Sequence, residues 1–462
     1  MNDTSSRIDV KVCTDASRPR DQGHIYVRAQ QGRWQRLRRR LGWSLMLLFL
    51  LGPWLSWNGR QAILLDWAQQ RFHLFGMTIW PQDLTLLALL LTVAAFGLFF
   101  ITTWLGRVWC GFLCPQTVWT FWFIWVEQKL EGSANRRRQR DRGGRNADWL
   151  LRKGAKHLLW LLIALLSGFT FVAYFTPADE LAYGLLTLSA TPWPAFWVVL
   201  FTLCTYLNAG WMRTIMCTHM CPYSRFQSAM FDANTLSAAY DASRGEQRGP
   251  RSRNSDHRAQ GLGDCIDCEL CVQVCPAGID IRDGLQYECI NCGACIDACD
   301  QTMKRMGYRT GLVRYASENA LAGRNSGRAH MRVWCYGVMT VAVLALLVLA
   351  VAGRSTLALE VVRDRHQLYR ETLEGGVENT FTLKLANKSQ QPQRVVLSVE
   401  GLEQPGWHGP QQLTLVPGEV TEVPISLSLR AEVASAQRAR PILFVAGTEQ
   451  DQVRTESRFL MP

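Results

Sequence analysis

The chain has 462 residues, of which 48% are hydrophobic, and it carries 50 Lys and Arg against 38 Asp and Glu, a formal charge of +12. The high apolar fraction excludes a disordered or collagen-like chain. Eight of the fifteen cysteines lie within residues 265–299 and none lies in residues 343–462, a distribution that argues against a secreted scaffold held by disulfides.

Five long apolar runs predict transmembrane helices, each close to the ~20 residues that cross the hydrocarbon core. They lie at about Leu41–Trp57, Leu84–Leu105, His157–Phe175, Trp193–Met212 and Val333–Ala352. Tryptophans near the ends of these runs are typical of the aromatic belts of membrane proteins. The sequence therefore predicts a multi-domain membrane protein: a basic N-terminal arm over residues 1–40, four helices within residues 41–212 and a fifth over residues 333–352.

The charges of the connecting segments alternate and predict a topology. Lys and Arg number 10 in residues 1–40, 2 in 58–83, 10 in 127–156, none in 176–192 and 15 in 213–332. The positive-inside rule then places the N-terminus, the 106–156 loop and the 213–332 segment in the cytoplasm, and residues 353–462 on the other side of the membrane. Because the arginines follow the spans and form no basic face interleaved with aromatic residues, the sequence does not predict nucleic-acid binding.

Two cysteine runs, at residues 265–276 and 289–300, indicate a ferredoxin domain over about residues 255–310. Both runs have the C-x2-C-x2-C-x3-C spacing of bacterial two-cluster ferredoxins, in which the fourth cysteine of each run ligates the other cluster. Zinc suits this spacing less well. The second run ends at Asp300 where the usual motif has proline, which does not ligate, so two [4Fe-4S] clusters are still predicted. Cluster one would take Cys265, Cys268, Cys271 and Cys299, and cluster two Cys289, Cys292, Cys295 and Cys275.

A second cysteine pattern, C-x3-C-P, follows the second and fourth predicted spans. It places Cys110 and Cys114 after one span and Cys217 and Cys221 after the other. If each pair lies on a helix, its two thiols share one face, and the four would make a soft metal site. Met216, His219 and Met220 are further candidate ligands. Such a set suits Cu(I), a further iron–sulfur cluster or a redox dithiol pair. The alternative is that these are buried cysteines acting as small hydrophobic residues, but the repeated pattern favours a redox or metal role.

Within a predicted C-terminal domain over residues 353–462, residues 360–462 change in character, since Thr380–Leu385 and Thr421–Leu429 alternate apolar and polar side chains as half-buried strands do. Further strands are predicted near residues 395–399, 412–416, 442–446 and 453–459. Six or seven short strands predict an immunoglobulin-like β-sandwich with a docking or scaffolding role.

The motifs together resemble a known family. Trp109–Trp119, Cys217–Met230, Gly278–Glu288 and Gly307–Gly323 are similar to the FixG-type cytochrome c oxidase accessory proteins, also called CcoG. The resemblance implies a bacterial inner-membrane iron–sulfur protein that assembles a cbb-type haem–copper oxidase by reducing Cu(II) to Cu(I). It implies that Cys110, Cys114, Cys217 and Cys221 bind or reduce copper, and that the partners are the oxidase or its copper-delivery factors. The C-terminal sandwich would then be periplasmic.

Two other functions remain open at this point. One is a quinol-linked electron relay that feeds a periplasmic reductase and is indifferent to copper. The other is a non-enzymatic assembly scaffold with structural clusters. The sequence identifies neither the electron donor nor the oligomeric state, and a homodimer is compatible with it.

Overall fold

The computed structural model describes residues 25–80, 83–144, 146–253, 255–324, 331–364, 367–372, 376–389, 391–429, 439–448 and 451–461. The chain divides into two compact units. The first comprises the chain up to Pro53 together with Ala88–Ala345, and the second comprises Trp54–Leu87 together with the chain from Leu346 onward.

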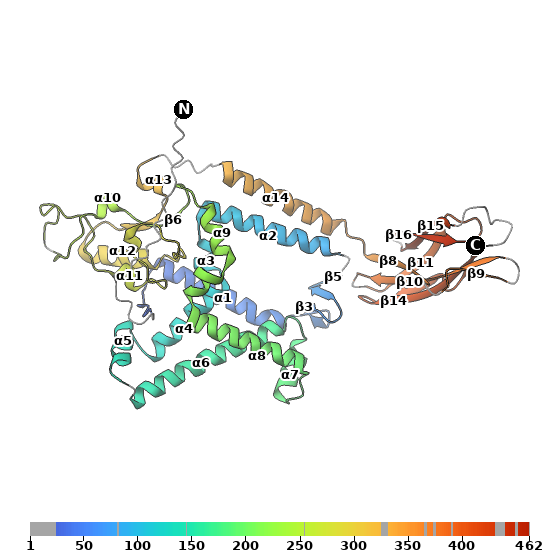
Figure 1. The fold of residues 1–462 in the computed structure, drawn as a ribbon, viewed down its shortest axis with the longest axis horizontal. Helices are drawn as coiled ribbons and strands as arrows, with labels where there is room; N and C mark the ends of the chain where they lie inside the picture. The colour runs from blue at the N-terminus through green and yellow to red at the C-terminus, as the bar shows by residue number, and fades with distance from the viewer. Residues whose placement is uncertain are drawn as a thin grey trace. The chain divides into compact units, whose positions relative to one another are not determined.

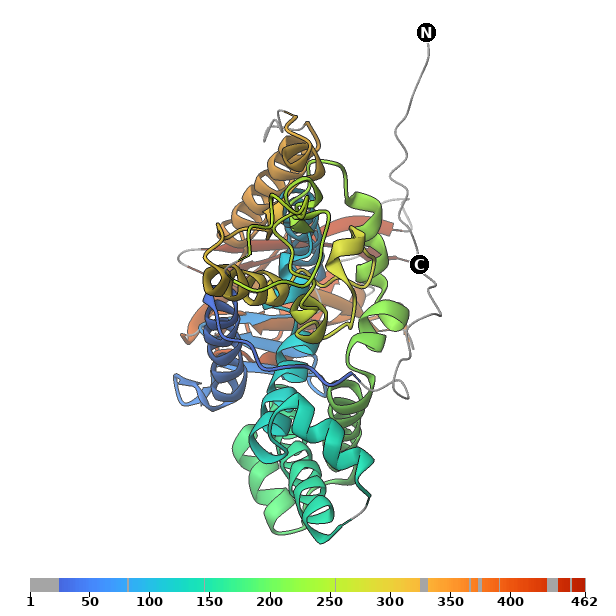
Figure 2. The same cartoon turned by 90° about the vertical axis from the view of Figure 1, so that its left-hand side faces the viewer.

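Four helices of the described residues are long and apolar enough to span a membrane. They are α2 (Leu84–Leu105), α6 (Ala147–Val172), α8 (Pro192–Tyr206) with its π-helical continuation η3 (Leu207–Met212), and α14 (Met331–Ala352). Of an apolar stretch of 18 residues in each of α2 and α14, only 6% is buried. These side chains therefore face outward, as contact with lipid requires. Helix α6 packs along α8 (Figure 1 and Figure 2), where Gly168 allows a close approach to Thr202. The last four predicted spans correspond to these helices.

The first predicted span is wrong in its extent. Helix α1 (Arg33–Leu51) starts eight residues earlier than the predicted Leu41 and gives way to a 3-10 turn at Gly52–Trp54, because Pro53 has no N–H to continue the helical ladder. The arginines of its first half keep α1 out of the four helices that qualify as spans. The expectation of a five-span topology therefore stays a prediction.

The predicted 106–156 loop is largely helical. It forms α3 (Val108–Phe112), α4 (Pro115–Leu130) and α5 (Ala134–Arg142) before α6 begins. Glu127 of α4 is buried between Arg137 and Arg213, at 2.8 and 2.6 Å. Burial raises the pKa of its carboxyl, but these two guanidinium groups outweigh that effect and hold the pKa below its ordinary value. Arg137 also donates to the carbonyl of Val27 at 2.7 Å, so the same ion pair anchors the extended segment before α1.

The first unit also contains a compact cysteine-rich part. A two-stranded sheet of β6 (Ser237–Tyr240) and β7 (Val313–Ala316) flanks it. Between these strands in the sequence lie α10 (Ala242–Gly245), α11 (Leu270–Gln273), the 3-10 turn η5 (Ile281–Asp283) and α12 (Ala294–Met306), coloured from yellow-green to gold in Figure 1. The remaining helices of the unit are α7 (Ala178–Leu186), the π-helical η4 (Met216–Met220), α9 (Pro222–Met230) and α13 (Glu318–Leu321).

The second unit contains a β-sandwich. One sheet has the order β12-β14-β10-β8 with β9 paired to β10, and the other has the order β13-β11-β15-β16. The strands are β8 (Leu357–Arg363), β9 (Arg370–Glu371), β10 (Val377–Asn387), β11 (Gln393–Glu400), β12 (Gly406–His408), β13 (Gln412–Leu415), β14 (Val420–Leu429), β15 (Ala439–Gly447) and β16 (Gln452–Leu460). Alternate side chains of both sheets share one core around Phe381, Phe444 and Phe459, which confirms the predicted strands.

The segment before α2, predicted as a loop over residues 58–83, contains short strands. They are β1 (Ser56–Trp57), β2 (Arg60–Gln61), β3 (Ile63–Asp66), β4 (Arg71–Leu74) and β5 (Met77–Ile79). This segment is joined to the sandwich within the second unit. Arg71 donates to the carbonyl of Gly418 at 2.8 Å, and Asp83 pairs with Arg354 and, at 2.9 Å, with Lys388.

Candidate functional site: two cysteine-lined cavities and a four-thiol cluster

The eight cysteines of the two ferredoxin runs surround two cavities. The first cavity is lined by Cys265, Cys268, Cys271 and Cys299. The second is lined by Cys275, Cys289, Cys292 and Cys295, with Cys271 also at its edge. Each cavity therefore has three cysteines from one run and a fourth from the other, the arrangement that the spacing predicts. The ligand roles of these residues stay predictions.

The backbone of both runs turns around its cavity in the same way. Asp267 and Glu269, on either side of Cys268, have φ values of 52° and 51°. Asn291 and Gly293 occupy the equivalent places around Cys292, with φ values of 59° and 72°. Left-handed residues on both sides of a cysteine curve the chain, as in the concave loops whose N–H groups surround iron–sulfur clusters.

Burial dominates the chemistry of these thiols. It raises the pKa of Cys271, Cys275 and Cys299 to about 12 and that of Cys289 to about 11. A buried thiolate needs positive charge, and cluster iron supplies it. Within the part of the chain that the structure describes, no three His, Cys, Asp or Glu side chains converge closely enough to hold a single metal ion. Four thiols around a cavity instead fit a multi-atom cube.

Asp300, the departure from the usual proline, has a structural partner. Its Oδ1 accepts a hydrogen bond from the N–H of Gly311 at 2.8 Å, and it thus fastens the turn after α12. Asp280 also has a structural partner, beside the first cavity, where its carboxylate pairs with Arg282 at 2.6 Å.

The C-x3-C-P segments are not continuous helices. Cys110 lies in α3, but Cys114 is the N-cap of α4, with Pro115 at the first helical position and an extended ψ of 127°. Cys217 lies in η4, and Cys221 is likewise the N-cap of α9, with a ψ of 112°. The expectation that each pair shares one helical face is therefore wrong, because a residue before proline is displaced from the helical region.

The two segments nevertheless bring their four cysteines near one another, into what we call the four-thiol cluster, although no three of these described side chains converge closely enough to hold one metal ion. Burial raises the pKa of the Cys110 thiol to about 12, and Cys114, Cys217 and Cys221 are near enough to raise it further. Burial likewise raises the pKa of Cys217 to about 11, with Cys114 and Cys221 adding to it. The Cys110 thiol donates to Oε1 of Gln227 at 3.3 Å.

The additional candidate ligands are less enclosed. His219 is exposed, and its Nδ1 is hydrogen-bonded to the hydroxyl of the adjacent Thr218 at 2.7 Å. Met220 is exposed too, with 57% of its surface accessible, while Met216 is half-buried.

The four-thiol cluster lies against the second cavity. Cys110 packs on the core that includes Cys292, Val274 and Ala298. A Cβ placed on Gly111 of α3 would lie 2.8 Å from the carbonyl oxygen of Ile290 and 2.9 Å from that of Asn291. The backbone of α3 is thus in direct contact with the loop between Cys289 and Cys292.

Arg107 joins these parts, and sequence reasoning missed it. Its side chain is buried and donates to the carbonyls of Tyr287 and, at 3.3 Å, Cys289. Its other terminal nitrogen donates to the carbonyl of Ser224, just beyond Cys221, at 2.9 Å. Gln227 was missed as well. A basic residue directly after an apolar span and a glutamine among helical residues were the available signals, and neither identifies a partner.

Comparison with known proteins agrees with this architecture. Residues 212–318 match the family model of a 4Fe-4S dicluster domain, and residues 347–462 match that of the IG-like fold at the C-terminal of FixG. Protein RdxA of Cereibacter sphaeroides is 40% identical over 373 residues, which are 77% of each chain. Nitrogen fixation protein FixG of Rhizobium meliloti is 36% identical over 419 residues, 82% of this chain and 79% of that protein.

The chain belongs to the FixG family. The two family models confirm the predicted ferredoxin-type domain, which implies [4Fe-4S] clusters, and the immunoglobulin-like C-terminal domain. A crystal structure of a FixG-related protein from Vibrio parahaemolyticus is 36% identical and covers 23% of this FixG-family chain and 97% of its own, with a TM-score of 0.22.

Proposed function

We propose that this protein is a membrane-bound one-electron relay that reduces Cu(II) to Cu(I) at the four-thiol cluster, in support of a cbb-type oxidase. Cys265, Cys268, Cys271 and Cys299 would hold one [4Fe-4S] cluster, and Cys275, Cys289, Cys292 and Cys295 the other. Each cluster, when bound, supplies a reversible one-electron store.

One observation carries the proposal: Cys110 packs against the core that contains Cys292, and α3 touches the loop beside it. A donor and an acceptor of single electrons are therefore in contact through protein atoms. Arg107 keeps them in register, since it donates to the loop of Cys289 and to the segment after Cys221.

The chemistry of the four thiols suits the reduced metal. Soft sulfur ligands prefer Cu(I), so binding stabilises the product of the reduction. Cu(II) gains one electron and becomes Cu(I), and the pair of thiols that ligates it loses its protons to solvent, since no three of the described cysteines converge on one ion. Binding at the thiols therefore favours Cu(I), the oxidation state in which copper is delivered.

The topology is part of the proposal. The alternation of basic segments supports a cytoplasmic ferredoxin domain and a periplasmic C-terminal sandwich. The sandwich would then be available for docking the oxidase or a copper-delivery factor, whose assembly lies on that side.

The experiment follows copper and clusters together. The full-length protein is reduced anaerobically, freed of excess reductant and mixed with Cu(II), and both EPR signals are recorded. We expect the EPR signal of one equivalent of Cu(II) to be lost for each electron stored in the clusters. Cys217→Ser is expected to keep the cluster signal and lose copper turnover, whereas the matched control Cys204→Ser, at an exposed span position, is expected to retain both.

Copper turnover that survives in both Cys217→Ser and Cys221→Ser would contradict the copper site. Clusters that stay reduced while Cu(II) persists in the wild type would favour a relay to another acceptor. A Cys292→Ser variant that harms oxidase assembly only in proportion to lost protein would favour a scaffold.

A further inference from the structure

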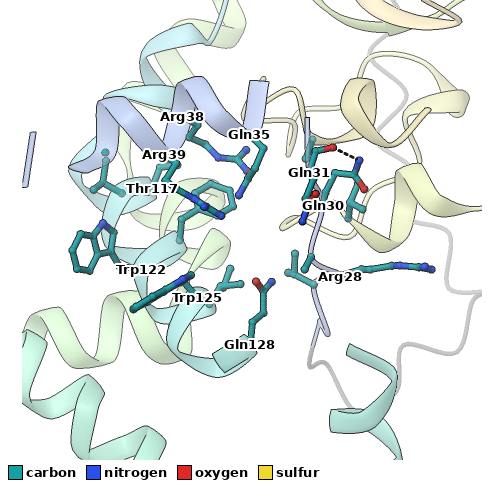
Figure 3. A pocket seen from close by; sticks show the side chains of 18 of the residues that line it. Arg28, Gln30, Gln31, Gln35, Arg38, Arg39, Thr117, Trp122, Trp125 and Gln128 are labelled. Carbon is teal, nitrogen blue, oxygen red and sulfur yellow. Dashed lines mark hydrogen bonds between the residues drawn. The ribbon is translucent and has the colours of Figure 1, made fainter. Parts of the chain in front are cut away.

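A cavity of about 440 Å³ lies beside the second cysteine-lined cavity and has no part in the proposed reduction of copper. Figure 3 shows its three walls. Helix α1 contributes Gln35, Arg38 and Arg39, α4 contributes Trp122, Trp125 and Gln128, and the extended segment before α1 completes it. Its volume is that of a small-molecule site.

The lining is amphipathic. Trp43, Trp122 and Trp125 offer flat apolar surfaces, and Trp43 and Trp125 are 43% and 41% exposed, so a membrane-dissolved ligand can reach them. The described lining residues also include four cations and no carboxylate; the cations are Arg28, Arg38, Arg39 and Lys129. A fitting ligand is therefore a flat ring with oxygen atoms that accept hydrogen bonds and develop negative charge.

The position of the cavity indicates that the ligand is redox-active. Ala294 lines this cavity and also the cavity of Cys289, Cys292 and Cys295, so the two spaces are neighbours that share a lining residue. Val274, the neighbour of Cys275, lines it as well.

Arg38 links the same two spaces electrostatically. It is 7% exposed, its guanidinium lies 3.8 Å from the Phe121 ring centroid, and it donates to the carbonyl of Cys292 at 3.1 Å. With Arg107 on the carbonyl of Cys289, two cations contact this loop. Positive charge stabilises the more negative, reduced form of a cluster and so raises its reduction potential. A weak reductant then suffices to fill it.

We propose that the cavity binds a membrane quinol, which is the electron donor of the relay; this inference rests on the proposed function. The quinol loses two electrons and two protons and becomes a quinone. The two electrons enter the protein, one for each cluster, and the two protons leave to water. Arg38 and Arg39 stabilise the negative charge that develops on the quinol oxygen as its proton leaves.

Binding is tested with the oxidised ligand, so that no turnover is needed. A short-chain ubiquinone is titrated into the detergent-purified holoprotein while tryptophan fluorescence is followed, and an azidoquinone photoprobe is mapped by mass spectrometry. We expect saturable quenching and labelling of peptides from α1 or α4. Arg39→Gln is expected to raise the half-saturating concentration about tenfold, the loss of one charge-assisted hydrogen bond. The control Arg40→Gln changes the adjacent, exposed arginine, which does not line the cavity, and is expected to bind normally.

A second arm adds quinol anaerobically and records the cluster EPR signal, which is expected in the wild type and in Arg40→Gln. The proposal would be overturned in favour of a lipid site by two results together. Quinone would neither quench the tryptophan fluorescence nor label α1 or α4, and phosphatidylglycerol nanodiscs would quench the fluorescence in a way that depends on Arg39. Dithionite-reduced protein that reduces Cu(II), although quinol leaves the clusters oxidised, would refute the donor site and leave the relay standing. Quinol-filled clusters that never reduce Cu(II) would support the donor site and refute the copper step.

Discussion

Arg107 has two effects on its surroundings that substitutions can separate. Its hydrogen bonds fix the distance between the loop at Cys289 and the segment after Cys221. Its charge favours the reduced state of whatever the second cavity holds. The Arg107 guanidinium provides both the charge and several N–H donors in a planar fork. A lysine would keep the charge and lose that fork of hydrogen bonds.

We predict that Arg107→Gln lowers the reduction potential of one cluster by about 60 mV, equivalent to a tenfold change in a one-electron equilibrium. Arg107→Lys is expected to restore most of that potential but not the rate of electron transfer to the thiols. Redox titration monitored by EPR gives the potential, and stopped-flow reoxidation by Cu(II) gives the rate. Equal potentials in all three proteins would show that Arg107 acts only as a structural tie.

At the scale of single residues, the cysteines of the site could be predicted from the sequence, but the residues that contact and position them could not. The spacing of Cys265 to Cys299 led to the two quartets that the structure brings together, because a short repeated spacing encodes local geometry. The partners of Arg107 and Gln227 lie more than a hundred residues away in sequence. No local pattern could indicate them.

At the scale of elements, the contact between α3 and the loop at Asn291 depends on Gly111. Any side chain there would meet the backbone oxygens of Ile290 and Asn291 at less than 3.0 Å. The backbone of a loop cannot yield as a flexible side chain does, so a larger residue must separate the two elements.

We predict that Gly111→Ala leaves both clusters assembled but slows their reoxidation by Cu(II) at least several-fold. The matched control is Gly154→Ala in α6, where an added Cβ would meet nothing within 4 Å and would favour the helix by up to ~1 kcal/mol. Stopped-flow absorbance of the reduced proteins provides the rates. An unchanged rate in Gly111→Ala would mean that electrons reach the thiols by another route.

The errors at this scale have a common cause. Pro53 ends α1 before the predicted Trp57, and Pro115 and Pro222 break the helices that the C-x3-C-P interpretation assumed. In each case composition was given more weight than the backbone restriction that proline imposes on its neighbours. The strands of the sandwich were predicted correctly, because a period of two needs no distant partner to be recognised.

At the scale of the whole molecule, Asp83 holds the second unit together across the sequence. It pairs with Arg354, 271 residues away, and with Lys388. Burial raises its pKa, but the hydrogen bonds from Lys388 and the Trp80 amide, together with Arg354, outweigh it and lower the pKa below the ordinary 3.8. Its stabilisation is therefore fully present above pH 3.8 and is lost as the pH falls through the lower, folded-state pKa.

We predict that Asp83→Asn destabilises the second unit by about 2 kcal/mol at pH 7, the scale of hydrogen bonds to charged groups. The difference from wild type should vanish in strong acid, below the folded-state pKa. Calorimetry of the full chain measures it. The control Glu422→Gln removes an exposed pair with Lys384 and is expected to unfold like the wild type. Equal unfolding of both variants would contradict the role of Asp83.

The long-range organisation could be predicted only in part. The apolar runs and the charge alternation indicate spans and segments, since each is a local property of composition. The joining of residues 54–87 to the sandwich is not local, and it was missed for that reason.

One of the differences between the loop around Cys292 and its counterpart is a glycine. Gly293 replaces the Glu269 of the first run, and a Cβ there would lie 2.9 Å from the Tyr315 hydroxyl and 3.0 Å from Trp34. The second loop is therefore enclosed by α1 and β7, and it also adjoins α3 and the cavity of Figure 3. In the proposed relay, donor and acceptor would meet at this one junction, and the first cavity would be a side branch. A cluster on such a branch would store the second electron of each pair, so that electrons arriving two at a time could be passed on singly.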